Sequence, residues 1–222
     1  MKLKIDFHVH TVYSSDGFIH PNELVAYARQ RGLDGVAVTD HDCFESGLRI
    51  AKETDFLILP GVEVSSLDGH IVGLKIANGV PSKLGSEETV ERIHRSGGIA
   101  VACHPIAFLK GSLGDRVTSQ FDAIEVINSS AFPFAYCRKK SEEIAARLGI
   151  TRVAGTDAHC SPEIGYAYTV VDAEPSVEAV LDAVRKGKCQ PYGEAIPFPL
   201  RLKRELRKLE RFARLDRTES AR

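Results

Sequence analysis

The chain has 222 residues, of which 43% are hydrophobic and 27% charged, and its formal net charge is −1. This composition is typical of a globular domain, and so small a net charge gives no overall field that would draw the protein to nucleic acid or membranes. Five cysteines without a CxxC pair argue against a disulfide framework or a thiolate zinc site, and no apolar stretch approaches the roughly 20 residues that span a bilayer. We therefore expect a cytoplasmic protein with no membrane span. The sequence leaves the oligomeric state unknown.

Strands and helices alternate along most of the chain. Short apolar runs predict strands at 5–10, 35–41, 56–64, 70–76, 99–103, 123–127, 151–156 and 166–171, and apolar spacing predicts helices at 21–30, 45–53, 86–96, 134–148 and 176–186. Such alternation is typical of parallel βαβ units, and about seven repeats favour a closed α/β barrel over an open sheet. No glycine-rich phosphate-binding loop follows the first strand, which argues against a nucleotide-binding doubly wound sheet.

The last part of the chain departs from this pattern. We expect the barrel to occupy residues 1–195 and a basic amphipathic helix or tail to occupy 196–222. Between Arg201 and Arg217 there are eight Arg and Lys residues against three acidic ones, which gives the segment a charge of +5, and apolar residues recur there at helical spacing (Leu202, Leu206, Leu209 and Phe212). Two interpretations stay open: a terminal helix laid across the barrel with a solvated outer face, or a helix that binds a phosphate-rich partner.

The first predicted strand carries a metal-binding pattern. Ile5, Phe7 and Val9 alternate with Asp6, His8 and His10, so the two imidazoles should project in parallel from one side of the strand. Two ring nitrogens at positions i and i+2 can bind one metal ion. Taken alone, the pattern also fits a half-exposed strand whose histidines are incidental.

Other polar residues at predicted strand ends favour the metal site. Six of the eight histidines lie at or next to such ends, together with three carboxylates; the set is His8, His10, Asp16, His41, Glu63, His70, His104, Asp157 and His159. The carboxyl ends of parallel strands meet at one end of a barrel. A cluster of six imidazoles and three carboxylates suits Zn, Mn or Fe, and is too rich in nitrogen for Mg or Ca alone.

The motifs that contain these residues resemble the polymerase and histidinol phosphatase (PHP) superfamily. They are Asp-Phe-His8-Val-His10-Thr, Val-Thr-Asp-His41-Asp, Gly-Val-Glu63, Cys-His104-Pro and Gly-Thr-Asp157-Ala-His159, within a resemblance that runs from residue 3 to about 190. The resemblance implies a distorted (β/α)7 TIM-like barrel of the PHP type with two to three divalent ions.

The resemblance also implies how the ligands are shared. The first ion would be held by His8, His10, Glu63 and Asp157. Glu63 would bridge to a second ion held by His104 and His70, and the third would be held by His41, His159 and Asp16. Asp16 stands where several relatives have a histidine.

These features predict a metal-dependent phosphoesterase. Its substrate would be a small phosphomonoester or a nucleotide or oligonucleotide end, and the nucleophile would be a metal-bridging hydroxide, which needs no serine or cysteine. Arg138, near the start of a predicted helix, is a candidate for binding the distal part of a phosphorylated substrate. The alternatives are an amidohydrolase-type C–N hydrolase, which expects a bridging lysine where this chain has Glu63, and a metal-stabilised nucleic-acid-binding module without activity.

Overall fold

The structure, a computed structural model, describes residues 1–108 and 110–219, without the side chains of 212 and 214–219. The predictions made for the side chains of Phe212, Arg214 and Arg217, and for residues 220–222, therefore lie outside the described residues. The strands are β1 (Lys2–Val9), β2 (Gly35–Val38), β3 (Leu57–Ser65), β4 (His70–Leu74), β5 (Ile99–Ala102), β6 (Ala123–Asn128), β7 (Thr151–Gly155), β8 (Ala167–Asp172) and β9 (Cys189–Gly193). The α-helices are α1 (Pro21–Gln30), α2 (Glu45–Glu53), α3 (Ser86–Arg95), α4 (Phe134–Leu148), α5 (Val177–Arg185) and α6 (Phe198–Glu219).

These elements form a nearly closed, distorted α/β barrel, as predicted, but the sheet is mixed and has nine strands in the order β7-β6-β5-β4-β3-β2-β1-β8-β9. Strands β1 to β3 are parallel to one another, and so are β5 to β7. Strand β4 is antiparallel to both of its neighbours, because only a short turn joins it to β3, and a parallel crossover needs a dozen residues or more. Strands β8 and β9, the second of which the sequence did not predict, close the sheet as an antiparallel pair.

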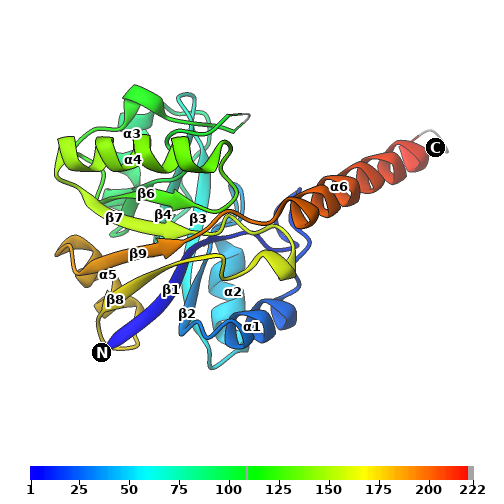
Figure 1. Cartoon of the computed structure of the whole chain (residues 1–222), viewed down its shortest axis with the longest axis horizontal. Helices are drawn as coiled ribbons and strands as arrows, with labels where there is room; N and C mark the ends of the chain where they lie inside the picture. The colour runs from blue at the N-terminus through cyan, green and yellow to red at the C-terminus, as the bar shows by residue number, and fades with distance from the viewer. Residues whose placement is uncertain (109, 220–222) are drawn as a thin grey trace.

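The helices cover the outside of the sheet in two groups. Helices α3 and α4 lie over the half that contains β4 to β7, while α1 and α2 lie beside β1 to β3 (Figure 1). Strand β1 serves two cores: Ile5 and Phe7 pack in the core that α5 covers, whereas Val9 packs with α1 and α2. The predicted strict alternation along β1 is therefore wrong, because an irregularity in its register with β2 between Asp6 and Val9 changes the side that Val9 faces.

Helix α6 leads away from the barrel and ends at the tip of the molecule in Figure 1. Its basic side is turned toward the barrel: Arg201 donates to the carbonyls of Ser129 and Ile196, and Arg204 is only 8% exposed. The outward side carries Leu206 and Leu209, which are 52% and 64% exposed, while Leu202, 49% exposed, lines the pocket over the barrel end. If α6 packed through its leucines, these would face the barrel and its basic residues would face away from it. Across the described residues, no helix has the length and apolarity needed to cross a membrane.

Candidate metal centre

The structure brings all nine predicted ligands to one end of the barrel. The strands that run parallel end there, and antiparallel β4 begins there, so the start of β4 faces the ends of its neighbours. The contributions are His8 from β1, His10 and Asp16 from the segment after it, His41 after β2, Glu63 from β3, His70 from β4, His104 after β5, and Asp157 and His159 after β7.

Glu63 is the centre of this cluster. Its Oε1 lies 2.9 Å from His70 Nδ1 and 2.8 Å from His104 Nε2. Its Oε2 lies 3.1 Å from His10 Nε2 and 3.2 Å from His41 Nδ1. His8 Nε2 also lies 3.4 Å from Oε2, so one carboxylate that is 1% exposed meets five imidazoles, an arrangement that lets a single side chain bridge neighbouring ions.

A second group of ligand atoms lies beside it. Atoms from His10, Asp16, His41 and His159 lie within 4.8 Å of one another, and His159 Nε2 is 2.9 Å from Asp16 Oδ2. The other oxygen, Asp16 Oδ1, is buried and has no hydrogen-bond partner among the described residues. A buried carboxylate oxygen without a partner is costly, and a cation would satisfy it. The donor set and this oxygen fit divalent metal ions; the identity of the metals and the division of ligands among individual ions stay predictions.

The charges of the cluster also favour cations. Burial by itself raises the pKa of the Glu63 carboxyl, but the imidazoles of His8 and His41 hold it well below its usual range. Burial lowers the pKa of the His10 imidazole, yet hydrogen bonds to Asp157 and Glu63 raise it to about 9. Carboxylates that raise the pKa of a fully buried imidazole create a negative potential, and the same potential attracts metal ions.

Two of the ligands have unusual backbone conformations. His104 has φ = 29° and Asp157 has φ = 55°, in the left-handed region that residues with a Cβ rarely adopt. Such strain persists only where surrounding structure holds it, and it concentrates at functional sites. Here His104 N donates to Glu125 Oε2 at 2.8 Å, and Asp157 N donates to the carbonyl of His8 at 2.8 Å.

Side chains behind the cluster fix the orientation of its imidazoles. Glu125 Oε1 lies 3.0 Å from His8 Nδ1, and Ser14 Oγ lies 3.0 Å from His10 Nδ1. In both rings the Nε2 atom is thereby left to face the cluster, as is usual for metal-ligating histidines. Sequence reasoning missed Glu125, although the signal was there: like Glu63, it interrupts an apolar strand.

Asp6 and Asp40 bind the backbone of neighbouring strands. Asp6 accepts from Thr156 N at 2.8 Å, and Asp40 accepts from Thr11 N at 2.6 Å and Thr11 Oγ1 at 2.7 Å. Asp6 thus joins β1 to the end of β7, and Asp40 holds the segment directly after His10. Both position the ligands without belonging to the clusters of ligand atoms.

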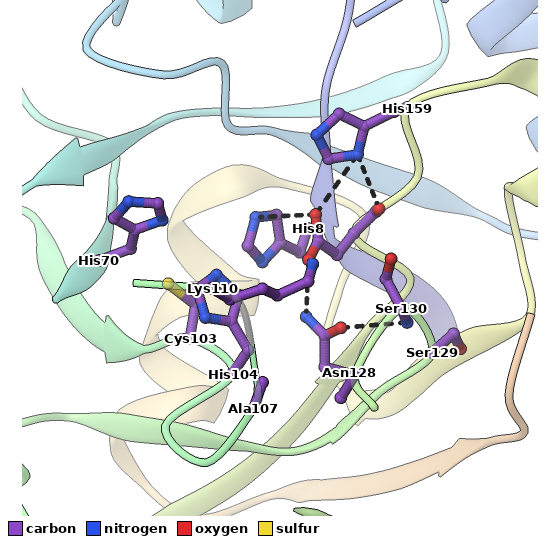
Figure 2. Close-up of polar contacts among 12 residues, drawn as sticks. His8, His70, Cys103, His104, Ala107, Lys110, Asn128, Ser129, Ser130 and His159 are labelled. Atoms are coloured by element: carbon purple, nitrogen blue, oxygen red, sulfur yellow. Dashed lines mark hydrogen bonds and ion pairs between the residues drawn. The ribbon is translucent and has the colours of Figure 1, made fainter. Parts of the chain in front are cut away.

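A pocket of about 700 Å³ opens above the cluster. Lys110 reaches into it from the loop after β5 and pairs with Asp157, in the same region as His8, Asn128 and His159 (Figure 2). Lys208 of α6 pairs with Asp16, with Nζ 2.9 Å from Oδ2. The sequence signals for these two lysines were weak, because each lies in a segment without a motif. The predicted substrate residue Arg138 is exposed on α4 and is not among the described residues that line this pocket.

The fold and this site define a barrel with a buried cluster of metal-binding side chains. A family model described as PHP-associated matches residues 137–189. An uncharacterized protein of Methanocaldococcus jannaschii is 33% identical over 141 residues, which is 57% of this chain and 82% of that protein. A 5'-3' exoribonuclease of Haemophilus influenzae is 38% identical over 81 residues, 33% of this chain and 29% of that enzyme.

Structural similarity agrees with these matches. The crystal structure of a two-domain protein from Bacteroides vulgatus, which contains a predicted PHP-like metal-dependent phosphoesterase, superposes with a TM-score of 0.69 at 20% identity over 87% of this chain and 65% of that one. The chain belongs to the PHP family and has the fold of its metal-dependent phosphoesterases.

Proposed function

We propose that this protein is a hydrolase of phosphoric esters that binds two to three divalent ions, Zn, Mn or Fe, and acts on a small phosphomonoester or on a nucleotide or oligonucleotide end. The observation that carries the proposal is the cluster of imidazoles and carboxylates around Glu63 at the bottom of an open pocket. When bound, such ions neutralise phosphate oxygens and ease the loss of a proton from water.

The residues of the chain itself support a phosphorylated ligand. Lys110 and Lys208 place two ammonium groups beside the cluster, each paired with a carboxylate that belongs to the predicted ligand set. A lysine near the ions can donate hydrogen bonds to the remaining phosphate oxygens and stabilise the charge that develops in the transition state. Asn128 Nδ2 donates to Asp157 Oδ2 at 3.3 Å, which helps to hold that carboxylate where Lys110 reaches it.

The experiment that tests the proposal is a measurement of metal content by mass spectrometry on protein purified without chelator. Release of phosphate from p-nitrophenyl phosphate is assayed on the same sample with added Mn or Zn. We expect two to three ions per chain and hydrolysis that a chelator abolishes. Bound metal without phosphate release would point to a C–N hydrolase or a module without activity, and no metal after reconstitution would overturn the proposal.

Replacement of the central carboxylate gives a sharper test. The variant Glu63→Ala should lose metal and about a hundredfold or more in hydrolysis, since this one carboxylate contacts five imidazoles. The matched control is Glu143→Ala, which removes an exposed carboxylate on α4. Circular dichroism checks that both variants keep the fold. Unchanged metal content in Glu63→Ala would contradict the assignment.

A further inference from the structure

The side of α6 that faces away from the barrel is apolar. Leu206 and Leu209 are more than half exposed, and Ala213 is exposed one turn beyond them. Leu202, at the edge of the pocket, continues the row toward the start of the helix. The outer side of a helix on a globular domain is normally polar, and a contiguous row of exposed apolar side chains marks an interaction surface. We call these four residues the apolar seam.

The opposite side of α6 is held by the barrel. Arg204 pairs with Glu163, and Lys208 pairs with Asp16. These ion pairs fix the rotation of the helix about its axis, so the seam stays turned outward. The helix also leads away from the barrel to the tip of the molecule, where a second molecule can reach it (Figure 1). Because these cations are engaged with the barrel, a phosphate-rich partner does not account for the exposed seam.

The spacing of the seam is that of a coiled coil. From Leu202 its members follow at intervals of four, three and four residues, which places Leu202 and Leu209 at d positions and Leu206 and Ala213 at a positions of a heptad repeat. Side chains at a and d interlock with the same positions of a facing helix. The partner that fits the seam is therefore a helix with a matching seam, and a second copy of this chain supplies one.

The charges beside the seam favour one orientation of that second helix. In the same heptads Lys203 and Glu210 occupy e positions and Glu205 occupies a g position, and all three are exposed. In an antiparallel pair, e positions face e positions, so Lys203 meets Glu210 of the partner subunit, and the two-fold symmetry repeats the pair. In a parallel pair, Glu205 would instead face Glu210 of the partner subunit, and the two carboxylates would repel each other.

We propose that α6 is a dimerisation helix, whose apolar seam packs against the seam of a second copy of this chain in an antiparallel, two-fold pair. This assignment is independent of the proposed function. The seam spans about three turns, so the dimer dissociates on dilution. Since Leu202 belongs both to the seam and to the lining of the pocket, the dimer places the second chain at the rim of the pocket.

Sedimentation equilibrium of the full chain over a wide range of concentration tests the dimer. We expect reversible association of the wild type. Leu206→Gln should raise the dimer dissociation constant by about a hundredfold or more, because the two-fold symmetry removes two buried leucines from each dimer. The matched control is Leu67→Gln, which changes an exposed leucine after β3, away from α6, and should leave the constant unchanged. Circular dichroism checks that both variants keep the fold.

Exchange of the flanking charges tests the orientation. Lys203→Glu and Glu210→Lys should each raise the dissociation constant by about 4- to 30-fold, because each variant converts two attractive pairs into two repulsive ones. The double variant Lys203→Glu/Glu210→Lys restores opposite charges at both pairs, so its constant should return to near that of the wild type. Recovery of this kind requires that the two positions face each other across the interface.

Three results would overturn the proposal. A wild type that stays monomeric at every concentration would leave a different protein as the occupant of the seam. An unchanged dimer in Leu206→Gln would place the interface elsewhere on the molecule. Tighter association of Glu210→Lys would show a parallel pair, in which the new ammonium group faces Glu205 of the partner subunit.

Discussion

Glu63 illustrates what a buried carboxylate needs in order to stay charged. It is 1% exposed, and removal from water would on its own favour the protonated form. Imidazoles around its two oxygens, those of His8 and His41 above all, reverse this preference. Several of these imidazoles also lie beside a second carboxylate, Glu125 or Asp157, so the charges of the cluster depend on one another.

Glu125 gives a prediction at the same scale. In Glu125→Gln the amide can still bond His8 Nδ1, but the negative charge that makes the imidazole a better ligand is lost. We expect metal affinity to fall by about 10- to 100-fold with the fold intact. Metal titration by calorimetry checks this, with Glu143→Gln as the control at an exposed position. Equal affinities for the wild type and Glu125→Gln would show that His8 is oriented by other contacts.

The predicted ligands were recognisable because polar residues at the ends of apolar strands are unusual enough to stand out. Glu125 carries the same signal, an acidic residue within an apolar strand, but none of the motifs named above contains it. Lys208 could not have been found in this way: it is one of many basic residues in 201–217, and only the path of α6 brings it to Asp16. Long-range placement of an isolated side chain leaves no mark in local sequence.

Among the elements, α6 departs most from expectation. The leucine spacing correctly predicts a helix, but the helix faces the barrel with Arg201, Arg204 and Lys208. Hydrophobic spacing indicates a helix and an apolar side, and only the partner surface decides which side packs. Here that surface offers carbonyls and carboxylates. The division into a barrel at 1–195 and a tail at 196–222 stays a prediction.

Arg204 provides the prediction for this element. Its Nη1 lies 3.3 Å from Oε1 of Glu163, which is fully buried, so Arg204→Met leaves a carboxylate without its charge partner. Loss of one partner of a buried pair costs about 3–5 kcal/mol. At about 2–4 °C per kcal/mol for a chain of this size, the Tm should fall by about 6–20 °C.

The control for Arg204→Met is Lys203→Met, which changes an exposed cation on the same helix and should leave the Tm nearly unchanged. Addition of Glu163→Gln to Arg204→Met should restore part of the loss, since the neutral amide removes the unpaired charge and can still accept from His159 N. A Tm equal to that of the wild type in Arg204→Met would mean that α6 contributes little to stability.

The strand and helix pattern of the barrel was largely predictable, because apolar runs of four to nine residues alternate with helical spacing through most of the chain. The direction of β4 was not read correctly, although its turn of four residues (66–69) excludes a parallel crossover. Strand β9 was missed because Cys189–Gly193 contains a proline and a glycine and has no buried residue, so it lacks the apolar signal of the other strands.

For the whole molecule, metal and stability should be linked. Ions that bind only the folded cluster stabilise it by about 4 kcal/mol at a free concentration a thousandfold above Kd. We expect the Tm of metal-loaded protein to fall by about 8–16 °C in excess chelator and to recover on addition of Mn or Zn. Differential scanning calorimetry measures this. In Glu63→Ala, chelator should change the Tm little, and a full shift in that variant would place the stabilising ions elsewhere.

The hydrogen bonds between β1 and the segment after β7 bear on when the cluster can form during synthesis of the chain. Asp6 bonds Thr156, and His10 N donates to the carbonyl of Ala158, so residues about 150 positions apart must meet before the cluster exists. A ribosome that adds about 5–20 residues per second reaches Asp157 and His159 on the order of 10 s after His8. Throughout that time the nascent chain carries the first histidines without their later partners. We therefore expect a nascent chain stopped before β7 to lack the complete cluster, since Asp157 and His159 follow that strand.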